Sequence, residues 1–287
     1  MLKYRIFTKR QLAARILLYL AVLLMLAFTA LPLIYVVLTA FKPLDELLRF
    51  PPTFFVSRPT LTNFSDLVTT LGSSDVPFLR YIFNSLLTTV ITVFLSVIVC
   101  CMGAYGMVKH KVPFSNFVFM IIVSALMFSG HVTQISNFMI VNSLGLVDSY
   151  WALIIPKIAV AFNFFMVKQF LEQMPDAYLE AARIDGAGEV LIFTRLVMPY
   201  LRPAIATLTV FSFVNNWNDY FSPLIFITQE QLKTLPLALQ SIGEGGNVAR
   251  AGAMAAATFL MTLPTILVFS FMQRKVIQTM AHSGIKA

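Results

Sequence analysis

Polar and aromatic side chains recur within one otherwise apolar stretch, residues 204–227. Amide and carboxylate groups can form hydrogen bonds with the hydroxyl groups of a solute, and aromatic rings can cover its C–H surfaces. Residues three or four apart share one face of a helix, so the polar members form a stripe. The stripe comprises Ser212, Asn215, Asn218, Asp219 and Ser222, with Trp217 and Tyr220 beside it.

This stripe cannot face lipid, because hydrocarbon would leave its polar groups unsatisfied. It must face protein or an aqueous path. We therefore expect Asn215, Trp217, Asn218 and Asp219 to border a path for a solute. The alternative is that the same groups form hydrogen bonds between helices.

A second polar run, residues 129–137, interrupts another apolar stretch. Gly130 favours a break in that helix, and Gln134 and Asn137 are spaced to line the same path. His131 lies in the run, but no second His, Cys or acid stands at metal spacing, so we assign no metal site.

Lys157 is a basic residue inside an apolar stretch, and a charge there needs a partner. Asp219 is the natural candidate, because it also lies in the outer half of its own stretch. We expect the two to form an intramembrane ion pair, which either fixes an outer gate or holds two helices together.

The elements that carry these side chains are expected to be transmembrane helices. Of the 287 residues, 58% are hydrophobic and 12% charged, and the mean hydropathy is +0.81. Soluble domains carry about 25% charged residues. A bilayer core needs roughly 20 apolar residues per helix. Stretches of this length occupy residues 16–41, 81–108, 116–141, 150–170, 204–227 and 252–272. The expected fold is all-α, with six spans in a single domain over residues 1–287.

The connections between these stretches differ in basic residues, and this difference predicts the orientation. Fourteen of the 21 Lys and Arg residues lie on one side and six on the other. Cytoplasmic loops are enriched in Lys and Arg. We therefore expect both termini and residues 172–199 to be cytoplasmic, and residues 42–80 to form an extracellular loop. That loop contains five prolines and is expected to be irregular, with one short helix.

The basic residues follow membrane topology and form no stripe, which argues against a nucleic-acid partner. The two cysteines, Cys100 and Cys101, are too few for a disulfide scaffold and are expected to pack as small apolar residues.

The cytoplasmic connection, residues 172–199, has the charge and periodicity of a helical segment. Pro175 and Asp176 favour a helix start and Gly186 a helix end, with a positive φ at that glycine. A second short helix is expected over residues 189–198. The resulting helix-turn-helix is too small to fold alone and is shaped to dock into another protein.

One spaced motif runs through this connection: Glu180, Ala181 and Ala182, then Gly186, and after nine intervening residues Leu196, Met198 and Pro199. It resembles the EAA loop of the membrane subunits of bacterial ABC importers, which has Ile and Leu at the positions of Leu196 and Met198. The resemblance covers nearly the whole chain. The run from Asn216 to Asp219 and the terminal Ser283-Gly284-Ile285-Lys286 are similar to the carbohydrate-uptake branch, as in the second membrane subunit of the maltose importer.

This resemblance implies a permease subunit that moves a sugar, in particular an oligosaccharide, across the bacterial cell membrane. The implied partners are a second, related permease, two ATPase subunits that bind ATP and Mg, and an extracellular solute-binding protein or lipoprotein. A coupling helix with Glu180, Ala181, Ala182, Gly186 and Pro199 would meet an ATPase. The chain lacks a GxxxxGK[ST] phosphate loop, so we expect no enzymatic activity and no cofactor in the chain itself.

Two alternatives remain open on the sequence. One is a secondary transporter driven by an ion gradient, although such proteins usually keep several functional acids within the spans. The other is an ABC importer permease for a solute other than a sugar.

Overall fold

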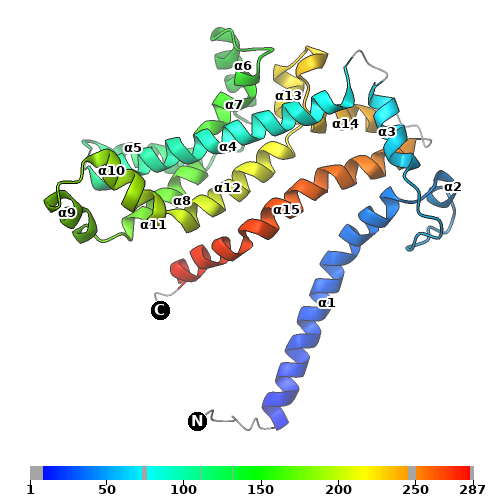
Figure 1. Ribbon diagram of the computed structural model, residues 1–287, viewed down its shortest axis with the longest axis horizontal. Coiled ribbons are helices and arrows are strands. Elements are labelled where there is room, and N and C mark those ends of the chain that lie inside the picture. The colour runs from blue at the N-terminus through cyan, green and yellow to red at the C-terminus, as the bar shows by residue number, and fades with distance from the viewer. Residues whose placement is uncertain (1–8, 73–75, 111, 131, 245–249, 285–287) are drawn as a thin grey trace. The chain divides into compact units, whose positions relative to one another are not determined.

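The computed structural model describes residues 9–72, 76–110, 112–130, 132–244 and 250–284 (Figure 1). Within these ranges every regular element is a helix. The chain divides into two units, which are treated separately below. The first comprises Met1–Thr70 and Gly245–Leu260, and the second comprises Leu71–Glu244 and Met261–Ala287.

The first unit contains α1 (Lys9–Ala40), α2 (Leu44–Leu47), most of α3 (Thr62–Gly72) and the start of α15 (Ala251–Gly284). Asn63 of α3 donates hydrogen bonds to the carbonyls of Ala40, at 2.9 Å, and Lys42, at 2.7 Å. The proline-rich connection after α1 therefore carries two helices, where the sequence favoured one.

Gly252 of α15 lies against Asn63 so closely that a Cβ atom there would be 2.1 Å from the side-chain oxygen. Gly252 thus packs against its own chain at the start of α15. A glycine is required because the Asn63 amide is already held by two carbonyls.

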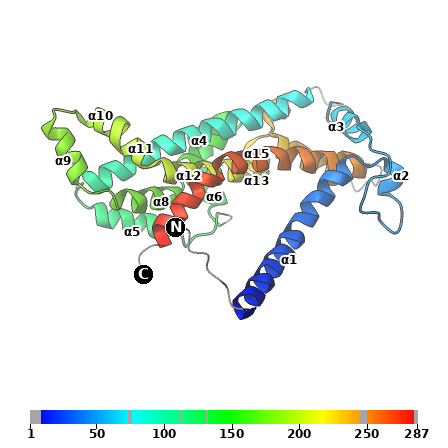
Figure 2. The same cartoon turned by 60° about the horizontal axis from the view of Figure 1, so that its bottom comes forward.

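The second unit is built around α4 (Phe78–Lys109), which packs along α7 (Tyr150–Ile158), α8 (Ala161–Glu172) and α12 (Arg202–Trp217) (Figures 1 and 2). Small residues on α4 permit close packing of these helices. Cys100 and Cys101 are both 0% exposed and lie in the shared core, as expected.

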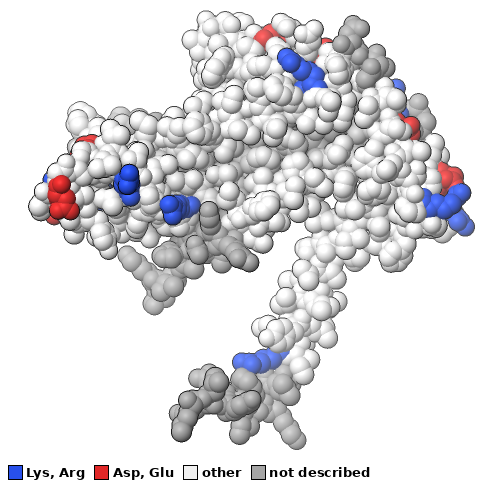
Figure 3. All heavy atoms as spheres, viewed as in Figure 1, with Lys and Arg blue, Asp and Glu red and all other residues white. Residues whose placement is uncertain are grey.

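The remaining helices of this unit are α5 (Ser115–Ala125), α6 (Gln134–Ser143), α9 (Ala177–Ile184), α10 (Glu189–Ile192), α11 (Met198–Tyr200), α13 (Phe221–Phe226) and α14 (Leu235–Glu244). A π-helical turn, Phe193–Val197, joins α10 to α11, and a 3₁₀ turn, Glu230–Leu232, precedes α14. On the face seen in Figure 3, charged side chains gather over α9–α11 and are sparse over the middle of the unit.

Four helices of the described residues are long and apolar enough to cross a membrane: Ala14–Ala40, Phe78–Lys109, Tyr150–Glu172 and Ala251–Gln273. A fifth is obtained if Glu189–Tyr200 and Arg202–Trp217, which are bent by 74°, are taken as one span. The expected stretch 116–141 is divided between α5 and α6, and the stretch 204–227 between α12 and α13. The division of 116–141 was predicted from Gly130 and the polar run around it, whereas the prediction of one continuous helix over 204–227 was wrong.

Candidate functional site

A polar cavity of about 460 Å³ lies where the C-terminal end of α12 faces α6, α7 and α8. Amide groups dominate its wall, and the charges are supplied by Lys157 and Asp219. Its polar lining consists of Gln134, Lys157, Asn163, Ser212, Asn215, Asn216, Asn218, Asp219 and Ser222. A wall of this kind offers many hydrogen-bond donors and acceptors with little net charge.

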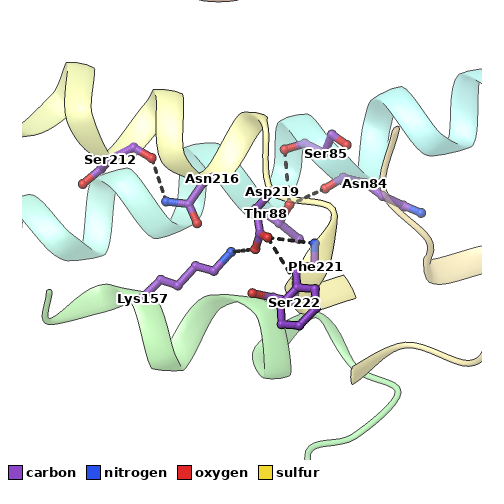
Figure 4. A network of polar contacts seen from close by, with 9 residues as sticks. All are labelled: Asn84, Ser85, Thr88, Lys157, Ser212, Asn216, Asp219, Phe221 and Ser222. Carbon is purple, nitrogen blue, oxygen red and sulfur yellow. Dashed lines mark hydrogen bonds and ion pairs between the residues drawn. The ribbon is translucent and has the colours of Figure 1, made fainter. Parts of the chain in front are cut away.

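Asp219 creates the break between α12 and α13 that forms one side of the cavity (Figure 4). Its Oδ1 accepts hydrogen bonds from the backbone N–H groups of Phe221, at 3.0 Å, and Ser222, at 3.1 Å. These bonds satisfy donors at the start of α13, so a new helix begins there. Pro223 in the first turn of α13 is compatible with this start.

Lys157 of α7 forms an ion pair with Oδ2 of Asp219, as the sequence led us to expect (Figure 4). The Lys157 side chain is 24% exposed and that of Asp219 is 17% exposed. The pair joins α7 to the α12–α13 break on the cavity wall.

On the cavity wall, the Asn163 amide of α8 donates a hydrogen bond to the Ser212 hydroxyl of α12 at 2.8 Å. Both residues are buried. The Asn216 amide donates to the Ser212 carbonyl at 2.7 Å, and the Asn218 amide donates to Val214 at 2.9 Å. Sequence reasoning missed Asn163, although the signal that selected Asn215, an amide within an apolar stretch, applied equally to it.

Two expected lining residues lie elsewhere. Trp217 is only 3% exposed, stacks on Phe213 and donates its indole N–H to the Met261 carbonyl at 3.0 Å. The ring therefore packs against α15, because one helical turn places it on the same face as Phe213. Asn137 lies on α6 but does not line the cavity. The path role assigned to Asn137 and Trp217 on the sequence therefore stays a prediction that this cavity does not support.

His131 lies outside the described residues. Within the described part of the chain, no three His, Cys, Asp or Glu side chains converge as a metal site.

The residues of the motif from Glu180 to Pro199 lie on and after α9. Glu180 and Ala181 are exposed, whereas Ala182 packs partly against the core. Gly186 ends this segment with φ = +81°, the positive value expected there. Tyr178, Ile184 and Val190 add exposed apolar surface around Glu180. A solvent-facing apolar patch of this kind is typical of an interaction surface.

Pro199 follows the π-helical turn and lies in α11, not after a completed second helix. Proline has no backbone N–H, so the regular bond to the carbonyl four residues earlier is missing. The helix widens just before it and then turns by 74° into α12.

Glu189, at the start of α10, is the centre of a polar network that sequence reasoning did not find. Its carboxylate accepts hydrogen bonds from the hydroxyl of Tyr105 at 2.6 Å and from Nε of Arg183 at 3.0 Å. Nε2 of His110 lies 3.3 Å away. The Tyr105 hydroxyl and then the Arg183 guanidinium hold the Glu189 pKa below its ordinary value. Tyr105 lay inside an apolar stretch, so only the tertiary structure reveals this contact.

The opposite end of α4 holds the chain that leads into α14. Tyr81 donates its hydroxyl to Glu230 at 2.8 Å, and Asn84 donates to the carbonyls of Gln231 and Lys233 at 2.9 and 2.8 Å. Tyr150 donates in turn to the Asn84 side-chain oxygen at 2.7 Å.

Asp148, in the turn before α7, binds the first residues after α13. It accepts hydrogen bonds from the Thr228 hydroxyl at 2.5 Å and from the Thr228 and Gln229 N–H groups at 2.6 and 3.0 Å. The Thr228 hydroxyl and these N–H groups lower the Asp148 pKa.

Comparison with known proteins gives one consistent result. The family model described as "Binding-protein-dependent transport system inner membrane component" matches residues 13–282. Protein LplC of Bacillus subtilis (strain 168) is 30% identical, over 91% of this chain and 90% of that protein. The arabinooligosaccharides transport system permease protein AraQ of Halalkalibacterium halodurans is 28% identical, over 91% of this chain and 93% of that protein.

A solved structure shares the fold. It is the crystal structure of a bacterial ABC transporter involved in the import of the acidic polysaccharide alginate. One of its chains superposes with a TM-score of 0.79 at 20% identity, covering 93% of this chain and 98% of that chain.

Proposed function

The chain belongs to the family of binding-protein-dependent transport system inner membrane components, and we propose that it moves an oligosaccharide as one permease of an ABC importer. The observation that carries the cargo assignment is the amide-lined cavity of the second unit. Its two charges neutralise each other, which suits a hydroxyl-rich solute better than a phosphate or another strong anion. Relatives whose names specify arabinooligosaccharides or lactose support the same cargo class.

In the proposed topology the chain crosses the membrane six times, with α5–α6, α7–α8 and α12–α13 acting as broken spans. Both termini and residues 172–199 would be cytoplasmic, and residues 42–80 extracellular. The distribution of Lys and Arg supports this orientation. Broken helices lining a polar cavity are a recurring feature of transporters.

The proposed partners are a second, related permease, two ATPase subunits that bind ATP and Mg, and an extracellular solute-binding protein. Helix α9 is the proposed coupling helix: Glu180 would meet a basic group of the ATPase, and Ala181 and Ala182 would let the helix seat closely. Gly186 would form the turn after α9. Pro199 would maintain the widened helix that leads to α12. A related alginate transporter structure in complex with a periplasmic protein supports the binding-protein partner.

Gln134, Asn215, Asn218 and Asp219 are the residues we propose to border the sugar path. Their side chains lie on the cavity wall, whereas Asn137 is an amide of the same region outside it. Asn218→Leu and Asn137→Leu are therefore matched substitutions that differ in access to the cavity.

The test is ATP-dependent uptake of a labelled oligosaccharide by vesicles that contain the assembled importer. Loss of a hydrogen bond costs about 1 kcal/mol, which corresponds to roughly fivefold in a rate or binding constant. Asn218→Leu is expected to lower uptake by this factor or more, and Asn137→Leu to leave it unchanged. Uptake that requires an ion gradient and ignores ATP would contradict the proposal.

A further inference from the structure

We propose that the cytoplasmic end of α4 holds α9 at both of its ends and transmits the displacement of α9 along α4. We call the two α4 donors, Tyr105 and Lys109, the α4 clamp. The inference rests on the proposed function, in which an ATPase moves α9. It assigns Tyr105 and Lys109 as positioning residues for that coupling.

The first contact of the α4 clamp is at the beginning of α9. Nζ of Lys109 donates to Oδ1 of Asp176 at 2.7 Å and to the Met174 carbonyl at 2.6 Å. Asp176 is the residue directly before α9. The Lys109 side chain is only 5% exposed, so its ammonium group depends on these two acceptors.

The second contact is beyond the end of α9, on the far side of the Gly186 turn. Tyr105, which is 6% exposed, donates its hydroxyl to Glu189 at 2.6 Å. The other carboxylate oxygen of Glu189 accepts from Arg183, in the last turn of α9, at 3.0 Å. Glu189 thus connects α4 to α9 as well as to the start of α10.

Tyr105 and Lys109 are four residues apart, so they lie one turn apart on the same face of α4. One helical face therefore contacts the chain both before and after α9. Leu179 is the buried residue of α9 itself. A displacement of α9 can therefore reach α4 through these two polar contacts, beside the packing of Leu179 and Ala182 against the core.

Helix α4 is suited to carry such a displacement. It is continuous over 32 residues, about 48 Å at 1.5 Å per residue, and it runs from beside α10 to beside α14 (Figure 1). Its opposite end holds the segment before α14 through Tyr81 and Asn84. The helix thus physically connects the segment proposed to meet the ATPase with the other end of the cavity-forming unit.

The experiment removes the two donors from α4 and leaves the sequence of α9 and α10 intact. The double variant Tyr105→Phe/Lys109→Met, in the assembled importer in vesicles, is compared with wild type for ATP hydrolysis and for sugar uptake. Hydrolysis is expected to continue, because the proposed ATPase-facing residues are unchanged. Uptake per ATP is expected to fall about tenfold, which corresponds to about 1.4 kcal/mol. Lys109→Arg, which retains a donor, should keep most of the wild-type ratio.

Tyr200→Phe is the matched control, because it removes a tyrosine hydroxyl for which the described residues offer no hydrogen-bond partner. It should leave uptake per ATP unchanged. If the double variant does not assemble, the isosteric Tyr105→Phe variant decides, with a fall in the ratio supporting the α4 clamp.

The α4 clamp is overturned, while the proposed function stands, if uptake per ATP is unchanged in the double variant, or in Tyr105→Phe where the double variant does not assemble. An equal fall of this ratio in Tyr200→Phe overturns it as well. A wild-type complex whose uptake does not depend on ATP overturns the proposed function, and the α4 clamp with it.

Discussion

Removing Asp219 while Lys157 remains should destabilise the protein far more than removing both charges of the pair. Leaving a buried charge unpaired costs about 3–5 kcal/mol. The Lys157 and Asp219 side chains are 24% and 17% exposed, so we expect a cost near the lower end of this range. Asp219→Leu also removes the hydrogen-bond acceptor at the start of α13, which adds about 1 kcal/mol. We therefore expect a total loss of about 4 kcal/mol for this variant.

The other two variants follow from the same contacts. Lys157→Met leaves the Asp219 carboxylate with its two backbone N–H donors, so the expected loss is smaller, about 2 kcal/mol. In Lys157→Met/Asp219→Leu no charge is left unpaired, and mainly the α13 cap is lost. The expected loss is about 1–2 kcal/mol, less than for Asp219→Leu alone.

The assay is the thermal unfolding midpoint of the purified protein in detergent. At about 2–4 °C per kcal/mol, Asp219→Leu should lower the midpoint by roughly 8–16 °C and the double variant by clearly less. Lys233→Met is the control, because its ion pair with Glu230 is more exposed and should contribute at most about 1 kcal/mol. A double variant that loses as much as the two single variants together would refute the reasoning.

Three further outcomes are expected. Gly186→Val should lower transport-linked ATP hydrolysis more than Gly186→Asn, because φ = +81° strains a β-branched residue while Asn tolerates it; equal rates would argue against a conformational role. The lowered pKa of Asp148 means that its stabilising contribution is present above the unfolded value near pH 4 and is lost as pH falls through the folded value. Amide exchange at Thr228, corrected for intrinsic rates, should therefore accelerate in acid, and Asp148→Asn should abolish that pH dependence. Gly252→Ala should destabilise the first unit by about 1–3 kcal/mol through the clash with Asn63, and Asn63→Ala should reduce this effect in a double variant, as unfolding midpoints would show.

Much of the helical content could be predicted because membrane helices follow from local composition. The stretch 81–108 became α4 with its ends displaced by one to three residues, since no proline or buried carboxylate interrupts it. The stretch 204–227 was predicted as one helix, yet Asp219 ends α12 by binding the next backbone N–H groups. A signal was present in the sequence, because an acid four residues before Pro223 is compatible with a helix start.

The candidate site was predictable where residue chemistry decided and unpredictable where packing decided. The contact between Lys157 and Asp219 followed from the cost of an isolated charge in an apolar stretch. Trp217 was assigned to the path because of its aromatic ring, but the same ring gains more by packing on Phe213 and bonding Met261. The contact between Tyr105 and Glu189 joins residues 84 positions apart, and no local pattern reports it.

The adjacent thiols of Cys100 and Cys101 are the two cysteines of the chain, and the packing of α4 against its neighbours encloses both. A water-soluble maleimide cannot reach a sulfur atom that is 0% exposed, so the natural protein should behave towards this reagent as if it had no cysteine. A single cysteine introduced on the exposed face of α9 could then carry a fluorophore or spin label without prior replacement of Cys100 and Cys101. Slow labelling of the natural thiols under turnover conditions would conversely report that α4 separates from its neighbours during the transport cycle.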